Sequence, residues 1–173
     1  MSLAPLILLR KLHSLPEHSG KEKRTSALLR EVMARVRPDG AIVSLSGHSF
    51  ACVAGPQDNR LLIRSDMDAV SGPGGRPSHL CGHDGHAALL VRTASLLSRE
   101  GRGYVFLFQG EEETGKGGYR ALRTLSEKGI SFSTALGFHN IPGYPLGTAL
   151  VKGGSFTQAS VGFSLYLKRE SSH

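Results

Sequence analysis

The stretch Leu61-Leu-Ile-Arg-Ser-Asp66-Met-Asp68 combines a nearly all-apolar run with two carboxylates at its C-terminal end. Such an apolar run is typical of a strand that is buried on both faces of a sheet. Polar side chains that directly follow a strand of an open α/β sheet lie at the edge where ligands bind. The stretch therefore predicts a buried strand and one side of a functional cleft.

Predicted strands and helices alternate along the chain on both sides of this stretch. Apolar or alternating runs predict strands at residues 41–45, 50–54, 61–65, 104–108, 134–138, 148–151 and 161–167. Apolar residues at helical spacing predict helices at residues 22–36, 86–99 and 118–128. Strands that alternate with helices indicate an α/β fold in which helices cover both faces of the sheet.

The composition, 173 residues with a hydrophobic fraction of 39%, is that of one ordinary folded domain. The apolar run at residues 6–9 is too short to span a membrane, and its charges follow it rather than precede it as in a signal peptide. We therefore expect a cytoplasmic protein without membrane binding, in which Cys52 and Cys81 are reduced thiols.

The net charge of +7 would favour binding to nucleic acid. The basic residues are scattered, however, and no aromatic residues interleave with them, so we expect no nucleic-acid partner.

Four polar clusters carry the candidate chemistry. Three of them follow predicted strands: Asp66 with Asp68, residues 111–113, and His139. The fourth, before a predicted helix, reads His79-Leu-Cys81-Gly-His83-Asp84-Gly-His86. The carboxyl ends of the strands of an α/β sheet converge on one crevice, so we expect the clusters to meet there. Thiolate, imidazole and carboxylate groups together favour a divalent ion such as Zn, Mn, Co or Ni over Mg or Ca.

Each cluster taken alone also has an ordinary explanation. A single histidine is more often a core or surface residue than a ligand, and residues 111–113 could form a solvated turn. The shared position of the clusters at strand ends favours the metal site. Cys52 is expected to be a small buried residue in a strand, and His13, His18 and His48 are expected to lie outside the site.

These motifs resemble those of the M20 metallopeptidase family, in particular its amidohydrolase branch of N-acyl amino acid, hippurate and auxin-conjugate hydrolases. The resemblance covers nearly the whole chain, and its most specific part is the run at residues 79–86. Its other parts are residues 10–17, Arg64-Ser-Asp66-Met-Asp68-Ala69, the segment at 108–118, and Gly137-Phe-His139-Asn-Ile-Pro142. The resemblance implies a three-layer α/β sandwich with a mixed, mostly parallel sheet.

The resemblance also implies a role for each site residue. Two divalent metal ions would be bound by four ligands: Cys81, His83, Glu113 and His139. Glu112 would be the general base, and His173 matches a family histidine that polarises the scissile carbonyl. Asp66 and Asp84 would orient the ligand imidazoles. The implied reaction is hydrolysis of the amide bond of an N-acyl amino acid or small peptide by a metal-activated water.

The chain departs from the family pattern in three ways. Gly110-Glu111 stands where the family has Pro-Ala, and the loop between Asp68 and His79 is shorter than usual. Family members are also much longer, with an inserted dimerisation domain and a later segment that supplies a last metal-binding histidine. We therefore expect residues 1–160 to form the N-terminal portion of the catalytic domain and residues 161–173 to begin the dimerisation domain, with a homodimer in a full-length form.

Two other functions are compatible with the sequence. A catalytically incomplete relative could act as a binding or regulatory module, and the missing last histidine favours this interpretation. A basic nucleic-acid-binding protein could carry a structural zinc site at Cys81 and His83. The second alternative is disfavoured, because structural zinc sites usually have four ligands at Cys-x-x-Cys-like spacing.

Overall fold

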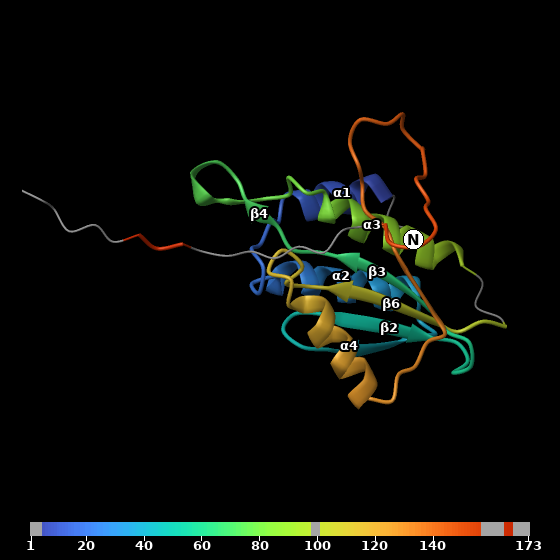
Figure 1. Cartoon of the computed structure of the whole chain (residues 1–173). Helices are drawn as coiled ribbons and strands as arrows, with labels where there is room; N and C mark the ends of the chain where they lie inside the picture. Colours follow the sequence, from blue (N-terminus) through green and yellow to red (C-terminus); the bar gives the residue numbers. More distant parts are fainter. Residues whose placement is uncertain (1–4, 98–100, 157–164, 168–173) are drawn as a thin grey trace, which may run out of the picture. The chain divides into compact units, whose positions relative to one another are not determined.

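The computed structural model describes residues 5–97, 101–156 and 165–167 (Figure 1). The chain divides into two compact units, Met1–Asn140 and Ile141–His173. All helices and strands of the described part belong to the first unit. The domain boundary expected at residue 160 stays a prediction, since residues 157–164 lie outside the described part. No helix in the described ranges is long and apolar enough to cross a membrane.

Five strands form the main sheet, in the order β1-β2-β6-β3-β7. Their bounds are β1 Ala41–Ser44, β2 Phe50–Ala54, β3 Leu61–Asp66, β6 Tyr104–Gln109 and β7 Thr134–Gly137. β3 runs parallel to both β6 and β7, whereas β2 is antiparallel to both β1 and β6. A short 3-10 turn, η1 (Pro73–Gly75), lies between the two small strands β4 (Val70–Ser71) and β5 (Pro77–Ser78). The predicted mixed sheet is confirmed, and its described strands form two parallel and two antiparallel pairs.

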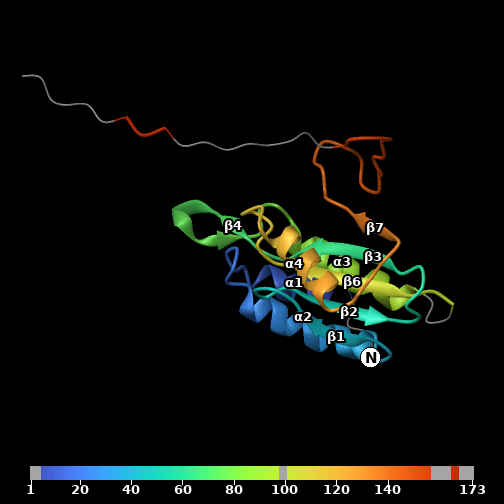
Figure 2. The same ribbon diagram turned by 60° about the horizontal axis from the view of Figure 1, so that its bottom comes forward.

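Helices cover both faces of this sheet (Figures 1 and 2). The described helices are α1 Pro5–His13, α2 Lys23–Val36, α3 His83–Leu96 and α4 Gly117–Glu127. α2 and α3 pack on one face, and α1 lies against α3. α4 packs on the opposite face. The arrangement is the expected three-layer α/β sandwich.

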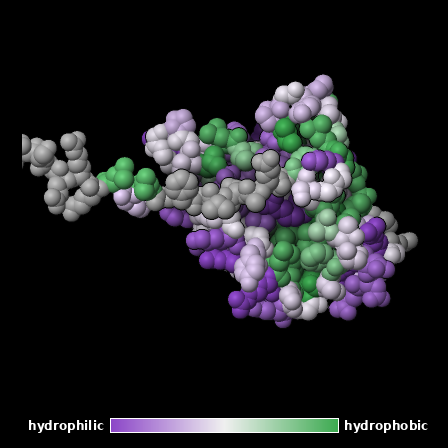
Figure 3. Space-filling view, viewed as in Figure 1, coloured by the Kyte–Doolittle hydropathy of each residue, from purple (hydrophilic) through white to green (hydrophobic). Residues whose placement is uncertain are grey.

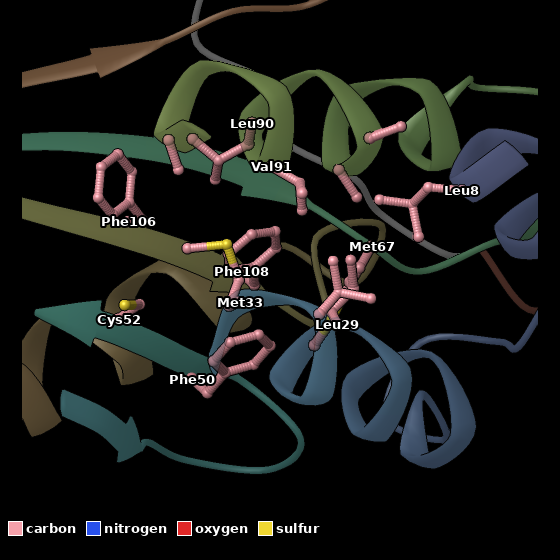
Figure 4. Close-up of a cluster of buried hydrophobic side chains, with 14 of the residues drawn as sticks. Leu8, Leu29, Met33, Phe50, Cys52, Met67, Leu90, Val91, Phe106 and Phe108 are labelled. Atoms are coloured by element: carbon pink, nitrogen blue, oxygen red, sulfur yellow. The ribbon is translucent and has the colours of Figure 1, made fainter. Parts of the chain in front are cut away.

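The larger core lies between the sheet and helices α2 and α3. Figure 4 shows side chains from both helices and from β2 and β6 pointing into it, including Leu29, Met33, Leu90, Phe50, Phe106 and Phe108. The rings of Phe50 and Phe108 are stacked, with centroids 4.7 Å apart. Cys52 is buried in β2, as predicted. This packing fixes α3 against the sheet, and the first turn of α3 carries the histidine cluster.

The opposite face of the sheet is covered by α4, the one described helix on this side, and by Ile130 and Phe132, which follow it. Ala121 and Leu125 of α4 contact a smaller core cluster that includes Leu62 and Leu107. Leu122 of the same helix stays exposed. Figure 3 shows apolar surface, in green, next to the place that α4 occupies in Figure 1. This face is therefore the less completely covered of the two.

The predicted strand at residues 148–151 is wrong. The backbone N–H of Thr148 donates to the carbonyl of Pro145 (3.1 Å), and Gly147 has a φ of 86°, so a turn forms here. Residues 148–151 do not pair with any described strand. An apolar alternating segment forms a strand only where a neighbouring strand is present to pair with it. Residues 157–164, which hold most of the strand predicted at 161–167, lie outside the described part, and residues 165–167 are not in a strand.

The N-terminus of α2 is capped by Glu17, which gives a first testable prediction. Its carboxylate accepts the backbone N–H groups of Arg24 (3.1 Å) and Thr25 (2.8 Å). Loss of a capping side chain costs about 1 kcal/mol, so Glu17→Ala should lower the free energy of unfolding by about that amount. Urea unfolding followed by circular dichroism measures the change.

The matched control is Glu31→Ala on an exposed part of the same helix. Glu31 forms only an exposed i, i+4 ion pair with Arg35, and such pairs contribute less than about 0.5 kcal/mol. Equal losses in the two variants would contradict the capping role of Glu17.

Candidate metal centre

The predicted site residues converge where three neighbouring parallel strands end. Asp66 ends β3, Glu112 and Glu113 follow β6, and His139 follows β7. His83 begins α3, which packs against β3. Because β6, β3 and β7 are adjacent and parallel, their C-terminal ends bring these side chains together.

His83 lies at the centre of this cluster and is fully buried. Its Nδ1–H donates to the backbone carbonyl of Asp68 (2.9 Å), so Nε2 carries the lone pair. Nε2 has no hydrogen-bond partner among the described residues. It lies 3.6 Å from a carboxylate oxygen of Glu113 and 3.8 Å from one of Glu112. A buried, unpaired nitrogen beside two carboxylates is what a metal-binding imidazole presents.

Cys81 and His139 extend the cluster. The Sγ atom of Cys81 lies 3.3 Å from Nε2 of His139. The Nδ1–H of His139 donates to the carbonyl of Asn140 (2.7 Å), so its Nε2 lone pair also faces the cluster.

Three sets of possible ligand atoms lie within 4.8 Å of one another: Cys81 with His83 and His139, Asp66 with His83 and His86, and His83 with Glu112 and Glu113. His83 belongs to all three sets. The described part of the chain therefore contains one continuous cluster of donors here rather than three separate sites.

The charges of the cluster fit a bound cation. Burial, together with the nearby carboxylate of Glu113, raises the pKa of the Cys81 thiol to about 11. Burial and the charge of Asp66 also raise the pKa of Glu112. Both shifts reflect the cost of adding negative charge at this place. A divalent cation removes that cost, because it deprotonates a coordinating thiol and neutralises carboxylates.

His86 has a structural role that the sequence pattern did not predict. Its Nδ1 lies 2.7 Å from a carboxylate oxygen of Asp66, and its Nε2 lies 2.6 Å from Oδ1 and 3.1 Å from the backbone nitrogen of Asn140. Both ring nitrogens are therefore engaged, so His86 links the end of β3 to the segment after β7. The signal in the sequence is the i, i+3 spacing of His83 and His86, which places both rings on one side of α3.

Asp66 and Asp84, the two aspartates with a predicted role, each form a hydrogen bond with a histidine. Asp66 accepts from His86 and lies 3.6 Å from Nε2 of His83. Asp84, which the resemblance assigns to orienting a ligand imidazole, bonds His13 at the end of α1 (2.7 Å), a histidine outside the predicted ligand set.

Asp68, which received no role from the sequence, is the aspartate beside Nδ1 of His83 (3.5 Å). Burial alone would raise its pKa, but the nearby His83 ring and hydrogen bonds from Ser19 and the Glu113 N–H lower it to about 2. Asp68 therefore stays ionised beside the cluster. His173, the other predicted catalytic residue, lies outside the described part.

The two cysteines should differ in their reaction with alkylating reagents. Cys52 is fully buried, and burial raises the pKa of its thiol to about 11, whereas Cys81 is partly exposed. We expect iodoacetamide to modify Cys81 slowly and Cys52 only after unfolding. Zinc should protect Cys81, since a metal-bound sulfur is not free to react. Peptide mass spectrometry with and without zinc measures both effects, and unprotected Cys81 would contradict its place in the metal site.

Comparisons with known proteins indicate one family. The family model for Peptidase family M20/M25/M40 matches residues 62–164, more than half of the chain. A probable hydrolase of Synechocystis sp. is 34% identical over 95% of this chain and 45% of its own length. An N-acetylcysteine deacetylase of Bacillus subtilis is 31% identical over 95% of this chain and 47% of its own length.

Solved structures agree with this result. The crystal structure of a Bacillus subtilis protein, a dinuclear metal-binding peptidase of the M20 family, matches with a TM-score of 0.69 and 27% identity. The match covers 83% of this chain and 44% of that structure. The chain thus spans slightly less than half the length of these relatives.

Proposed function

Because the chain belongs to Peptidase family M20/M25/M40, we propose that it supplies the catalytic centre of a metal-dependent amidohydrolase. The bond hydrolysed is the amide bond of an N-acyl amino acid or small peptide, and a relative that deacetylates N-acetylcysteine supports this class of substrate. The observation that carries the proposal is the buried, unpaired Nε2 of His83, which lies among the donor atoms of Cys81, His139 and the two glutamates.

The cofactors of the proposed enzyme are two divalent metal ions. Their ligands are Cys81, His83, Glu113 and His139, and the dinuclear relative supports the number of ions. Sulfur and nitrogen donors favour Zn, Mn, Co or Ni over Mg or Ca. When bound, such ions supply a water molecule of lowered pKa and polarise the amide carbonyl.

Glu112 is the general base of the proposed reaction. Its carboxylate is partly exposed and lies next to Nε2 of His83, where the donor atoms converge. From this place the carboxylate can take a proton from the attacking water and return it to the leaving amine. The backbone N–H of the neighbouring Glu113 donates to Asp68 (3.0 Å). This bond holds the backbone in one orientation at the two glutamates, one of which is the proposed base and the other a proposed ligand.

Further parts of the proposal rest on the likeness to longer relatives. Residues 1–160 are assigned to the catalytic domain and residues 161–173 to the start of the dimerisation domain, from which His173 would polarise the carbonyl. A homodimer of the full-length form belongs to the same proposal. The free thiols of Cys52 and Cys81 support a place in the cytoplasm.

Metal analysis combined with an amidase assay tests this function. Protein dialysed against Zn or Mn is compared with Cys81→Ser and with the matched control Cys52→Ala, whose thiol lies in β2. We expect Cys81→Ser to lose metal and Cys52→Ala to keep it, and we expect a full-length form to turn over a panel of N-acyl amino acids that includes N-acetylcysteine. A wild-type chain that binds no metal overturns the proposal. Metal binding without turnover in a full-length form supports the alternative, a binding or regulatory module.

A further inference from the structure

We infer that Glu22 is a positioning residue that holds the loop carrying Glu112 and Glu113 in its metal-binding conformation. This loop, Gly110–Glu113, is called the carboxylate loop below. The inference rests on the proposed function, since it assigns a task to a residue that lies outside the donor cluster. Glu22 precedes α2 and lies far from the carboxylate loop in the sequence, but a hydrogen bond to Glu111 connects the two in the folded chain.

The side chain of Glu22 is not used by its own helix. Glu22 is the N-cap residue of α2, a position from which a side chain ordinarily accepts a first-turn N–H. It makes no such bond. Glu17 binds the N–H groups of Arg24 and Thr25 in its place. The carboxylate of Glu22 is therefore free to serve another segment.

That segment is the carboxylate loop. Oε1 of Glu22 accepts the backbone N–H of Glu111 (2.9 Å) and that of Gly20 (2.8 Å). The side chain is 0% exposed, and Oε2 has no hydrogen-bond partner in the described part of the chain. Burying a carboxylate with one unpaired oxygen is unfavourable for stability. We infer that the buried carboxylate is kept at this position because it holds the carboxylate loop.

The loop approaches Glu22 closely. A Cβ atom on Gly110 would lie 3.1 Å from the carboxylate atoms of Glu22, closer than such contacts usually are. Glu111 has a φ of 57°, in the left-handed region that side chains other than glycine rarely adopt. A loop with this backbone needs external contacts to stay in one conformation.

Three side chains supply those contacts from different parts of the fold. Ser49 accepts the N–H of Gly110 (2.9 Å), Glu22 that of Glu111, and Asp68 that of Glu113 (3.0 Å). Three of the four amide groups of the loop are thereby fixed. The directions in which Glu112 and Glu113 leave the backbone follow from these three bonds.

The test compares zinc affinity and stability in four variants. Glu22→Asp keeps the charge but is too short to reach Glu111, and it can cap α2 instead. We expect its zinc affinity, measured by competition with a chelator, to fall about tenfold or more, as when other groups that orient metal ligands are lost. Its urea midpoint should not fall below that of the control Glu17→Ala. Glu22→Gln keeps an acceptor for Glu111 and should stay within about threefold of wild type.

The control separates positioning from stability. Glu17→Ala weakens the same end of α2 without touching the carboxylate loop, so it should lose stability and keep its zinc affinity. Gly110→Ala tests the contact from the loop side, since the added methyl group presses on Glu22, and it should also weaken zinc binding. This variant serves if Glu22→Asp does not fold.

The outcomes distinguish this inference from the proposed function. If wild type binds zinc and Glu22→Asp and Gly110→Ala bind it equally well, the role of Glu22 is wrong and the proposed function stands. A parallel loss of affinity in Glu17→Ala also overturns the role, because zinc binding would then follow stability alone. If wild type binds no zinc, the proposed function fails and this inference fails with it.

Discussion

In a full-length form, Glu112→Gln should leave the metal content of the protein unchanged and lower the hydrolysis of N-acyl amino acids by about 100-fold or more, the usual effect of losing a general base. Glutamine has nearly the shape of glutamate but cannot take a proton from water. The ligand sets of the cluster include Cys81, His83 and His139, which the substitution leaves in place. Metal retention with loss of turnover is therefore the expected signature.

Glu113→Gln provides the contrast. Its carboxylate lies 3.6 Å from Nε2 of His83, and we assign it as a ligand. The variant should lose metal as well as activity, because an amide is a weaker donor than a carboxylate. Metal analysis by mass spectrometry and kcat/KM on the substrate that wild type prefers measure the two effects. Equal metal content and equal turnover in both variants would show that the two glutamates do not divide the work.

The parts of the site that lie next to strands could be predicted from the sequence. Asp66, Glu112, Glu113 and His139 each come directly after a strand whose apolar residues are recognisable without a structure. Parallel pairing then brings the strand ends together, whatever the details of packing. For this reason the convergence of these donor groups was predictable.

The hydrogen bonds that orient the site could not be predicted in this way. Glu22 bonds Glu111 across 89 positions, and His13 bonds Asp84 across 71. No local pattern marks such pairs, because each depends on how segments far apart in the chain pack together. The wrong strand at residues 148–151 has a similar cause: alternation describes a side-chain pattern, but a strand also needs a neighbour with unpaired backbone groups.

Arg37 is the clearest case of a residue whose importance only packing reveals. Its side chain is 1% exposed, and its guanidinium lies over the rings of Tyr104 and Phe106, 5.7 and 5.4 Å from their centroids. Nε and Nη2 donate to Asp39 (3.1 and 2.8 Å), and Nη1 donates to the carbonyls of Ala94 and Leu97 at the end of α3. A cation at this end of a helix is favourable, because the last carbonyls lack partners within the helix.

Arg37→Ala should therefore lower the free energy of unfolding by about 3 kcal/mol, through the cavity it leaves and the polar groups it strands. Arg37→Lys should recover only part of this loss, since an ammonium group cannot donate in a fork or stack flat on a ring. Urea unfolding measures both, with Arg35→Ala as the control, because Arg35 has only an exposed pair with Glu31. A similar small loss for all three variants would refute this account.

Arg37 binds the end of α3 opposite to His83. Folded Arg37→Lys protein should therefore bind zinc with the same affinity as wild type, although its free energy of unfolding is lower.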